Sequence, residues 1–254
     1  MTELRVDHVG LRFGGLRALD DLSFTVTPGS LHALIGPNGA GKSSCFNVIG
    51  GLYRATEGTL TFGGTDLLAL RPHQRAGLGM GRAFQNTALS PHSTVLDNVM
   101  LGRHALTRGG FLSCALRLTA RQERVHRARA AEICDFLALG DVLDSPVGSL
   151  PYGRAKRVDI ARALAVEPSL LLLDEPAAGM NAAETAELAG TIQSVSQGLG
   201  ISVLLVEHDM NLVMGIADRV TVLDFGRVIA DGPPAEVQRD PQVIKAYLGT
   251  EAQT

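Results

Sequence analysis

The chain has 254 residues and a formal net charge of −3, and its pI near 6.2 excludes the basic excess of a nucleic-acid-binding domain, so no nucleic-acid partner is expected. Three widely spaced cysteines argue against a disulfide framework and a zinc site and fit a reducing compartment. Because neither a signal peptide nor an apolar run of roughly 18 residues is present, we expect a soluble, cytosolic chain that meets a membrane only through a partner.

The first part of the chain predicts short strands around a glycine-rich turn. Alternating apolar positions in residues 19–26 predict one strand, and the run LHALIG (31–36) predicts a buried strand. A glycine-rich turn, a helix from about residue 41 and the short strand GTLTFGG follow. This order is typical of the opening of an α/β domain.

The middle of the chain has a different pattern. Between about residues 66 and 149 the strand pattern fades, arginines accumulate, and a helical pattern covers TARQERVHRARAAEICDFLALG (119–140). Beyond this segment, the buried strands LLLLD (170–174) and ISVLLVE (201–207) alternate with helices. We predict an α/β fold with a mostly parallel core sheet, an antiparallel β part and an inserted helical subdomain. The last residues, GTEAQT, are expected to form a frayed tail.

A phosphate-binding motif follows the buried strand. GPNGAGKS fits G-x-x-x-x-G-K-[ST] at every specified position, with a strand before it and a helix after it. Its glycines let backbone N–H groups face phosphate oxygens, and the helix N-terminus adds partial positive charge. We expect Lys42 to reach the β- and γ-phosphates and the Ser43 hydroxyl to hold Mg²⁺. The expected triphosphate-binding residues are Gly36, Pro37, Asn38, Gly39, Ala40, Gly41, Lys42, Ser43 and Ser44.

Two carboxylates follow the buried strand LLLLD. Ligands of open α/β sheets bind at the carboxyl ends of the strands, which is where these side chains lie in the predicted fold. Asp174 is suited to hold Mg²⁺ through water, and Glu175 is suited to orient and deprotonate the attacking water. Together with the phosphate-binding motif, this pair predicts hydrolysis of a nucleotide.

Over essentially its whole length, this order of motifs resembles the ATPase subunits of ABC transporters. The resemblance implies a P-loop NTPase of the ABC ATPase type with ATP and Mg²⁺ as cofactors. It also implies one domain over residues 1–254, in which a helical subdomain at roughly residues 86–150 is inserted into a RecA-like core.

The resemblance assigns roles to further residues. Gln85, in GRAFQNTALS, matches the glutamine that touches Mg²⁺ and senses the transmembrane partner, and His208 matches the histidine that contacts the γ-phosphate. Phe13 stands where the family places an aromatic ring against adenine; the alternative is a core aromatic. The segment AAGMN (177–181) takes the place of the loop that crosses to the opposite subunit, without the Asp often found there.

The segment LPYGR (150–154) resembles the family signature LSGGQ, which faces the ATP bound by the opposite subunit. Tyr152 and Gly153 are therefore expected to contact the partner's nucleotide. Pro151 replaces the usual Ser, which removes a hydroxyl, and Arg154 replaces the usual Gln and could supply charge. We expect a loop that still works, with weaker or altered phosphate contact.

Cations crowd the helix start that follows this signature segment. Arg154, Lys156 and Arg157 oppose the helix dipole, which favours negative charge at that end. Given the resemblance, we interpret the awaited anion as a γ-phosphate on a second chain. Such a shared site predicts that the isolated chain binds ATP well and hydrolyses it poorly.

Finer features resemble the ATPases of branched-chain amino acid importers. They are FGGLRALDDLSF, GRAFQNTALSPHSTVLDNVMLGRH, LPYG, DEPAAG, EHDMNLVMGIADRV and PQVIKAYLG. The resemblance implies a second ABC ATPase subunit, two transmembrane permease subunits and, indirectly, an extracytoplasmic solute-binding protein. It places the chain peripherally on the cytoplasmic face of the membrane. Importers of urea, amides or other amino acids share this pattern and stay open as alternatives, because the ATPase does not touch the solute.

Other functions fit the sequence less well. A P-loop kinase gives no reason for LPYGR, DEP and EHD together, and non-transport ABC ATPases usually carry a long coiled-coil insertion or two cassettes. A purely regulatory nucleotide-binding module requires an inactive Glu175. The arginines between residues 103 and 129 form either a solvated face or a surface beside lipid headgroups or a membrane subunit.

Overall fold

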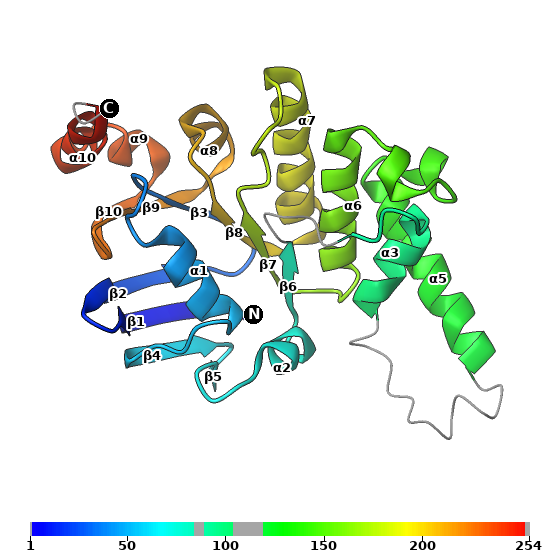
Figure 1. The fold of residues 1–254 in the computed structure, drawn as a ribbon, viewed down its shortest axis with the longest axis horizontal. Coiled ribbons are helices and arrows are strands. Elements are labelled where there is room, and N and C mark those ends of the chain that lie inside the picture. Colours follow the sequence, from blue (N-terminus) through cyan, green and yellow to red (C-terminus); the bar gives the residue numbers. More distant parts are fainter. Residues whose placement is uncertain (1, 84–88, 104–118, 252–254) are drawn as a thin grey trace.

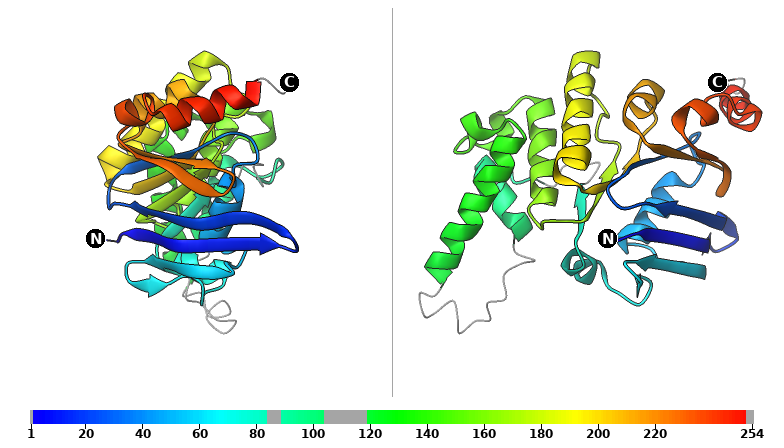
Figure 2. Two further views of the ribbon diagram at one scale, coloured as in Figure 1. Left: turned by 90° about the vertical axis from the view of Figure 1, so that its left-hand side faces the viewer. Right: turned by 180° about the vertical axis from the view of Figure 1, so that it is seen from behind.

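Two β-sheets and a group of helices make up the described part of the chain, which comprises residues 2–83, 89–103 and 119–251 of a computed structural model (Figure 1). The antiparallel sheet and the main helical group lie at opposite ends of the molecule, with the second sheet between them (Figure 2). None of the helices in these ranges combines the length and hydrophobicity that a bilayer crossing demands.

The first sheet is antiparallel, with strand order β2-β1-β4-β5. Its strands are β1 (Leu4–Phe13), β2 (Leu16–Val26), β4 (Glu57–Phe62) and β5 (Thr65–Asp66). Alternating residues of β1 and β2, such as Val6, Leu22 and Phe24, point into the interior, while the residues between them face outward. This alternation is what a sheet with one covered face requires.

The second sheet has the order β10-β9-β3-β8-β7-β6. Its strands are β3 (Leu31–Ile35), β6 (Met80–Ala83), β7 (Leu170–Asp174), β8 (Ser202–Val206), β9 (Arg219–Asp224) and β10 (Arg227–Gly232). All neighbouring pairs are parallel except β9 and β10, which form a hairpin. All five residues of β3 and of β8 are buried, as expected for parallel strands covered on both faces.

Helix α1 (Lys42–Gly50) packs between the two sheets. Its apolar side chains, including Phe46 and Ile49, join residues of both sheets in one core cluster. Further helices pack around the second sheet. They are the short helix α2 (Pro72–Gly77), α7 (Ala182–Gln193) with its π-helical continuation η4 (Ser194–Gly198), α8 (Met210–Ile216), α9 (Pro234–Val237) and α10 (Pro241–Glu251). Because α1 touches both sheets, it fixes the phosphate-binding motif that precedes it against the whole core.

The main helical group has its own core cluster, which continues into the second sheet. Its elements are α3 (Val95–Gly102), α5 (Thr119–Phe136), the 3₁₀ turns η2 (Gly140–Val142) and η3 (Val147–Ser149), and α6 (Tyr152–Leu164). Side-chain caps are found at the starts of α3, α7 and α8: Asp97 N–H donates to Thr94 Oγ1 at 3.1 Å, Asn181 caps α7 in a capping box with Glu184, and Asp209 caps α8.

The predicted fold class is confirmed, with two differences in detail. Strand β6 lies within the segment whose strand pattern fades, because its four residues MGRA contain no alternation of apolar and polar side chains. The expected frayed tail is wrong for residues 249–251, since α10 continues to Glu251. The single-domain organisation and the insertion bounds at roughly 86–150 stay predictions.

Candidate functional site

The phosphate-binding motif forms a tight turn between β3 and α1. Gly36 has φ +149° and Gly41 φ +103°, values that side chains rarely tolerate. A Cβ at Gly36 would lie 2.2 Å from Leu223 O, and one at Gly41 would lie 2.8 Å from Ala18 O. The turn is thus pressed against neighbouring backbone, which only glycine permits here.

Lys42 projects into this turn from the first residue of α1. Its ammonium donates to Gly36 O at 2.7 Å and to Pro37 O at 3.0 Å. Burial lowers the pKa of Lys42, and the Glu175 carboxylate opposes that shift. The cation is thereby held inside the curve of the motif, where phosphate oxygens would meet it.

A pocket of about 370 Å³ opens beside the motif. It is lined by Phe13, Leu16, Arg17, Ala18, Asn38, Gly39, Ala40, Gly41, Lys42, Ser43, Ser44, Glu175 and Phe225. Phe13 is 45% exposed, so the alternative of a core aromatic does not describe it. Its ring meets the Tyr53 ring edge-on, with centroids 5.1 Å apart and planes at 79°. The structure thus brings Phe13, the phosphate-binding motif (residues 36–44, called the cradle below) and Glu175 to one pocket, called the cradle pocket below.

Asp174 and Glu175 lie at the carboxyl end of β7. Asp174 is largely buried, which raises its pKa, and the Arg82 guanidinium 3.8 Å away opposes this shift. Glu175 has φ +46°, a strained value for a non-glycine residue, and its N–H donates to Val206 O at 2.9 Å. The sharp turn at Glu175 brings this residue to the pocket lining, whereas Asp174, at the strand end, is not among the lining residues.

Arg82 was not identified from the sequence. It extends from β6 toward α1, donates to Asn47 Oδ1 at 2.8 Å and lies 4.7 Å above the Phe46 ring. With its approach to Asp174, it links the acidic strand end to the helix that follows the cradle. No local pattern marks it, because its three contacts come from distant segments.

His208 follows β8 and has a largely exposed side chain. The Glu207 side chain beside it is fully buried and accepts from Ala177 N–H at 2.9 Å and from His208 N–H at 3.0 Å. Glu207, also missed from the sequence, therefore ties the loop after β7 to the end of β8. His208 does not line the cradle pocket. Gln85 lies outside the described residues.

Tyr152 and Gly153 lie at the start of α6, away from the cradle pocket. The Tyr152 hydroxyl donates to Ala178 O at 3.0 Å, so the signature segment contacts the loop after β7. A depression of about 350 Å³ lies beside the α7 start, and Gly153 lines it. The two predicted halves of a nucleotide site are thus on separate parts of this chain, α1 on one and α6 on the other (Figure 1).

The cations of the signature helix already have partners within the chain. Arg154 donates to Asp141 Oδ2 at 2.8 Å, and this bond lowers the pKa of Asp141. Arg157 pairs with Glu187. The interpretation that these cations await a γ-phosphate on a second chain stays a prediction, in which the phosphate would compete with these carboxylates. The compensating carboxylates lie 13 and 30 residues away in sequence, which hid them from the local pattern.

The residues present fit a magnesium ion. Ser43 lines the cradle pocket together with Glu175, and Asp174 directly precedes Glu175 at the end of β7, so a hydroxyl and a carboxylate are available as oxygen ligands at this end of the sheet. Mg²⁺ takes oxygen ligands and, when phosphates supply most of them, needs only one or two from the protein.

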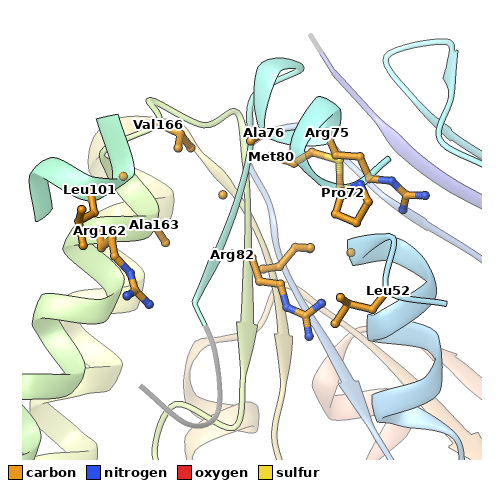
Figure 3. Close-up of a pocket in the computed structure, with 14 residues that line it drawn as sticks. Leu52, Pro72, Arg75, Ala76, Met80, Arg82, Leu101, Arg162, Ala163 and Val166 are labelled. Atoms are coloured by element: carbon orange, nitrogen blue, oxygen red, sulfur yellow. The ribbon is translucent and has the colours of Figure 1, made fainter. Parts of the chain in front are cut away.

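A second groove, of about 280 Å³, separates α1 and α2 from α3 and α6 (Figure 3). Apolar side chains of Leu52, Met80 and Leu101 line it together with Arg75, Arg82 and Arg162. Arg75 is anchored at its floor, because it donates to Val48 O at 2.7 Å and to Ile49 O at 2.6 Å at the carboxyl end of α1. The groove also adjoins β6, which precedes the segment that contains Gln85.

Comparison with known proteins agrees with these features. The family described as "ABC transporter" matches residues 19–178, and the family described as "Branched-chain amino acid ATP-binding cassette transporter" matches residues 227–253. The high-affinity branched-chain amino acid transport ATP-binding proteins LivG of Salmonella typhimurium and BraF of Pseudomonas aeruginosa are 39% and 38% identical to this chain over 248 residues, 97% of each protein.

Solved structures show the same fold. The ADP conformation of MJ1267, an ATP-binding cassette of an ABC transporter, superposes with a TM-score of 0.87 at 31% identity, covering 98% of this chain and 99% of that one. The dimeric structure of MJ0796, another ABC transporter cassette, gives a TM-score of 0.75 at 26% identity, with 91% and 98% covered.

Proposed function

The chain belongs to the ATP-binding cassette family of ABC transporters, and from this premise we propose that it powers import of branched-chain amino acids. The carrying observation is the pocket that joins Phe13, the phosphate cradle and Glu175. Identity to LivG over 97% of both chains supports the solute class, which the pocket itself does not touch.

In this proposal the cradle holds the triphosphate of ATP. Its backbone N–H groups and the α1 N-terminus face the phosphates, and Lys42 exchanges its bonds with Gly36 O and Pro37 O for bonds with β- and γ-phosphate oxygens. Phe13 stacks on the adenine, since its ring is exposed in the pocket and its tilt is set by Tyr53.

Hydrolysis is assigned to the strand ends. Ser43, Asp174 and Gln85 would hold Mg²⁺, which neutralises charge that develops on the phosphates. Glu175 takes the proton of the attacking water and directs its oxygen at the γ-phosphorus. His208, held by Glu207 at the next strand end, contacts the γ-phosphate once a partner closes the site.

The signature half serves a partner subunit. Tyr152 and Gly153 lie apart from this chain's own cradle, so they complete the nucleotide site of a second ABC ATPase subunit, which in turn completes this one. Two transmembrane permease subunits and an extracytoplasmic binding protein make up the rest of the transporter, with this chain on the cytoplasmic face.

The groove between α2 and α6 is the proposed permease contact. Its mixture of apolar side chains and three arginines suits a short permease helix, and its floor reaches β6 and Arg82. Arg82 lines the groove and also lies 3.8 Å from Asp174. A permease segment bound in the groove would therefore be connected through the Arg82 side chain to the proposed magnesium site.

Reconstitution of the complete transporter in proteoliposomes tests this function. ATP is supplied on the side of the membrane that carries the ATPase subunits, and the binding protein is supplied on the opposite side together with either leucine or urea. Leucine should stimulate phosphate release, whereas urea should not. Stimulation by urea instead of leucine would reassign the solute, and absence of ATP-dependent phosphate release under both conditions would contradict the ATPase function.

A further inference from the structure

Phe225 occupies the turn of the β9–β10 hairpin and lines the cradle pocket. Its side chain is 85% exposed, the largest exposure among the large hydrophobic residues of the described chain. Neither the family motifs nor the assigned roles above involve this residue. An aromatic ring left open to water at the wall of a ligand pocket needs a physical account.

The turn is unfavourable for a phenylalanine. Phe225 has φ +43° and Gly226 has φ +78°, and positive φ at both central residues is the requirement of a type I′ hairpin turn. Asn-Gly is the preferred pair for this turn, because Asn tolerates the left-handed region and a bulky side chain does not. Phe225 therefore occupies a backbone conformation that is unfavourable for its side chain, so turn formation alone does not explain the presence of an aromatic residue.

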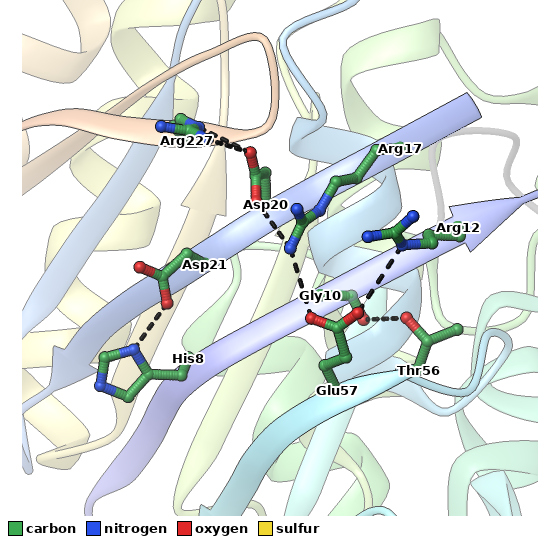
Figure 4. A network of polar contacts seen from close by, with 9 residues as sticks. All are labelled: His8, Gly10, Arg12, Arg17, Asp20, Asp21, Thr56, Glu57 and Arg227. Carbon is green, nitrogen blue, oxygen red and sulfur yellow. Dashed lines mark hydrogen bonds and ion pairs between the residues drawn. The ribbon is translucent and has the colours of Figure 1, made fainter. Parts of the chain in front are cut away.

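The neighbouring backbone fixes this turn against the pocket wall. Gly226 N–H donates to Ala40 O of the cradle at 2.9 Å, and Asp20 N–H donates to Gly226 O at 2.8 Å. Arg227, the next residue, donates to Asp20 Oδ2 at 2.7 Å (Figure 4). The turn is thus bonded on one side to the phosphate cradle and on the other to β2, and Phe225 lines the same pocket as Phe13.

We propose that Phe225 is a further nucleotide-contacting residue, whose ring packs on the base–ribose part of ATP while the cradle holds the phosphates. This inference rests on the proposed ATP site and adds a second aromatic contact to that of Phe13. Stacking on an aromatic side chain accepts any base, so the contact raises affinity for the nucleoside part and leaves the phosphate contacts unchanged.

The test compares two ligands, ATP and inorganic tripolyphosphate, by calorimetric titration of the full chain. Phe225→Asn removes the ring and installs the preferred residue of the turn, so its Tm should equal or exceed that of the parent. We expect its Kd for ATP to rise about fivefold or more, which is the lower end for loss of an aromatic that stacks on a base, with an unchanged Kd for tripolyphosphate.

Two further variants keep the result interpretable. Phe225→Tyr retains the ring and should keep the parent Kd for ATP. Phe136→Asn removes an exposed ring on α5, far from the pocket, and should leave the Kd values for both ligands unchanged. An unchanged Kd for ATP in Phe225→Asn would overturn the proposal, as would an equal loss of tripolyphosphate affinity, which would mean that the turn acts through the cradle. Failure of the parent chain to bind ATP at all would instead overturn the ATP site itself.

Discussion

The cradle half and the signature half of this molecule are built to different degrees of completeness. The cradle half gathers its cation, its acidic strand end and an aromatic wall around one pocket, and Lys42 and Glu175 both contribute to it. The signature half presents Tyr152 and Gly153 beside α7, with its arginines neutralised by Asp141 and Glu187. In the proposed function, the first half binds this chain's own nucleotide, whereas the second half contacts the nucleotide of a second subunit.

This difference separates two kinds of contribution. Residues of the cradle half should control nucleotide affinity in the isolated chain. Residues of the signature half should leave that affinity unchanged and act only in the assembled transporter. The four substitutions below test this division, because each has an outcome that would contradict it.

Glu175→Gln should have the largest effect. Loss of the proton acceptor should lower phosphate release by the assembled transporter about 100-fold or more, while ATP affinity is retained and a dimer accumulates with ATP trapped. Glu123→Gln, at an exposed position of α5, is the matched control. Unaltered turnover in Glu175→Gln would remove this residue as the base.

Lys42→Ala should weaken ATP binding by about 10- to 100-fold, because charge-assisted hydrogen bonds to the phosphates are lost. Isothermal titration of the isolated chain measures this, with Lys245→Ala, on the exposed side of α10, as the control. If both lysine variants bound ATP equally well, the cradle half would not be the nucleotide site.

Pro151→Ser should have a small effect, and only in the assembly. Pro151 already provides extended backbone before α6, with φ −54°, so the added hydroxyl changes one phosphate contact on the partner's nucleotide. We expect single-turnover phosphate release to change by less than about threefold. A sharp rise would mean that Pro151 handicaps the shared site.

Asp141→Asn should have the smallest effect. The Arg154–Asp141 pair is solvent-exposed, so a double-mutant cycle with Arg154→Gln in urea unfolding should give a small coupling free energy that falls as salt is added. A larger, salt-independent coupling would show that the signature helix depends on this pair for its structure.

Sequence patterns were sufficient for the parts of the site that are local. The cradle, Asp174 and Glu175 lie within short motifs at strand ends, where a parallel sheet brings its ligand-binding residues together. Phe225 and Arg82 could not be found in this way. Phe225 becomes a pocket residue only because its hairpin turn is bonded to Ala40 and Asp20, segments about 200 residues earlier in the chain.

The fold shows the same limit. Long apolar runs such as LLLLD predicted their strands, whereas β6 gains its conformation from pairing with β7 rather than from its own residues. The carboxylate partners of the α6 arginines could not be found from the sequence for a related reason. A cation at a helix start is unfavourable only when no carboxylate is near, and tertiary structure supplies Asp141 and Glu187.

Phosphate release from ATP preloaded on this chain, measured in a single turnover with and without its second ATPase subunit, tests the division between the two halves most directly. We predict that the chain by itself keeps its ATP unhydrolysed. The added subunit should accelerate phosphate release at least about 100-fold, because it contributes the missing phosphate contacts. Equal rates in both samples would contradict the account, because one chain would then suffice for catalysis.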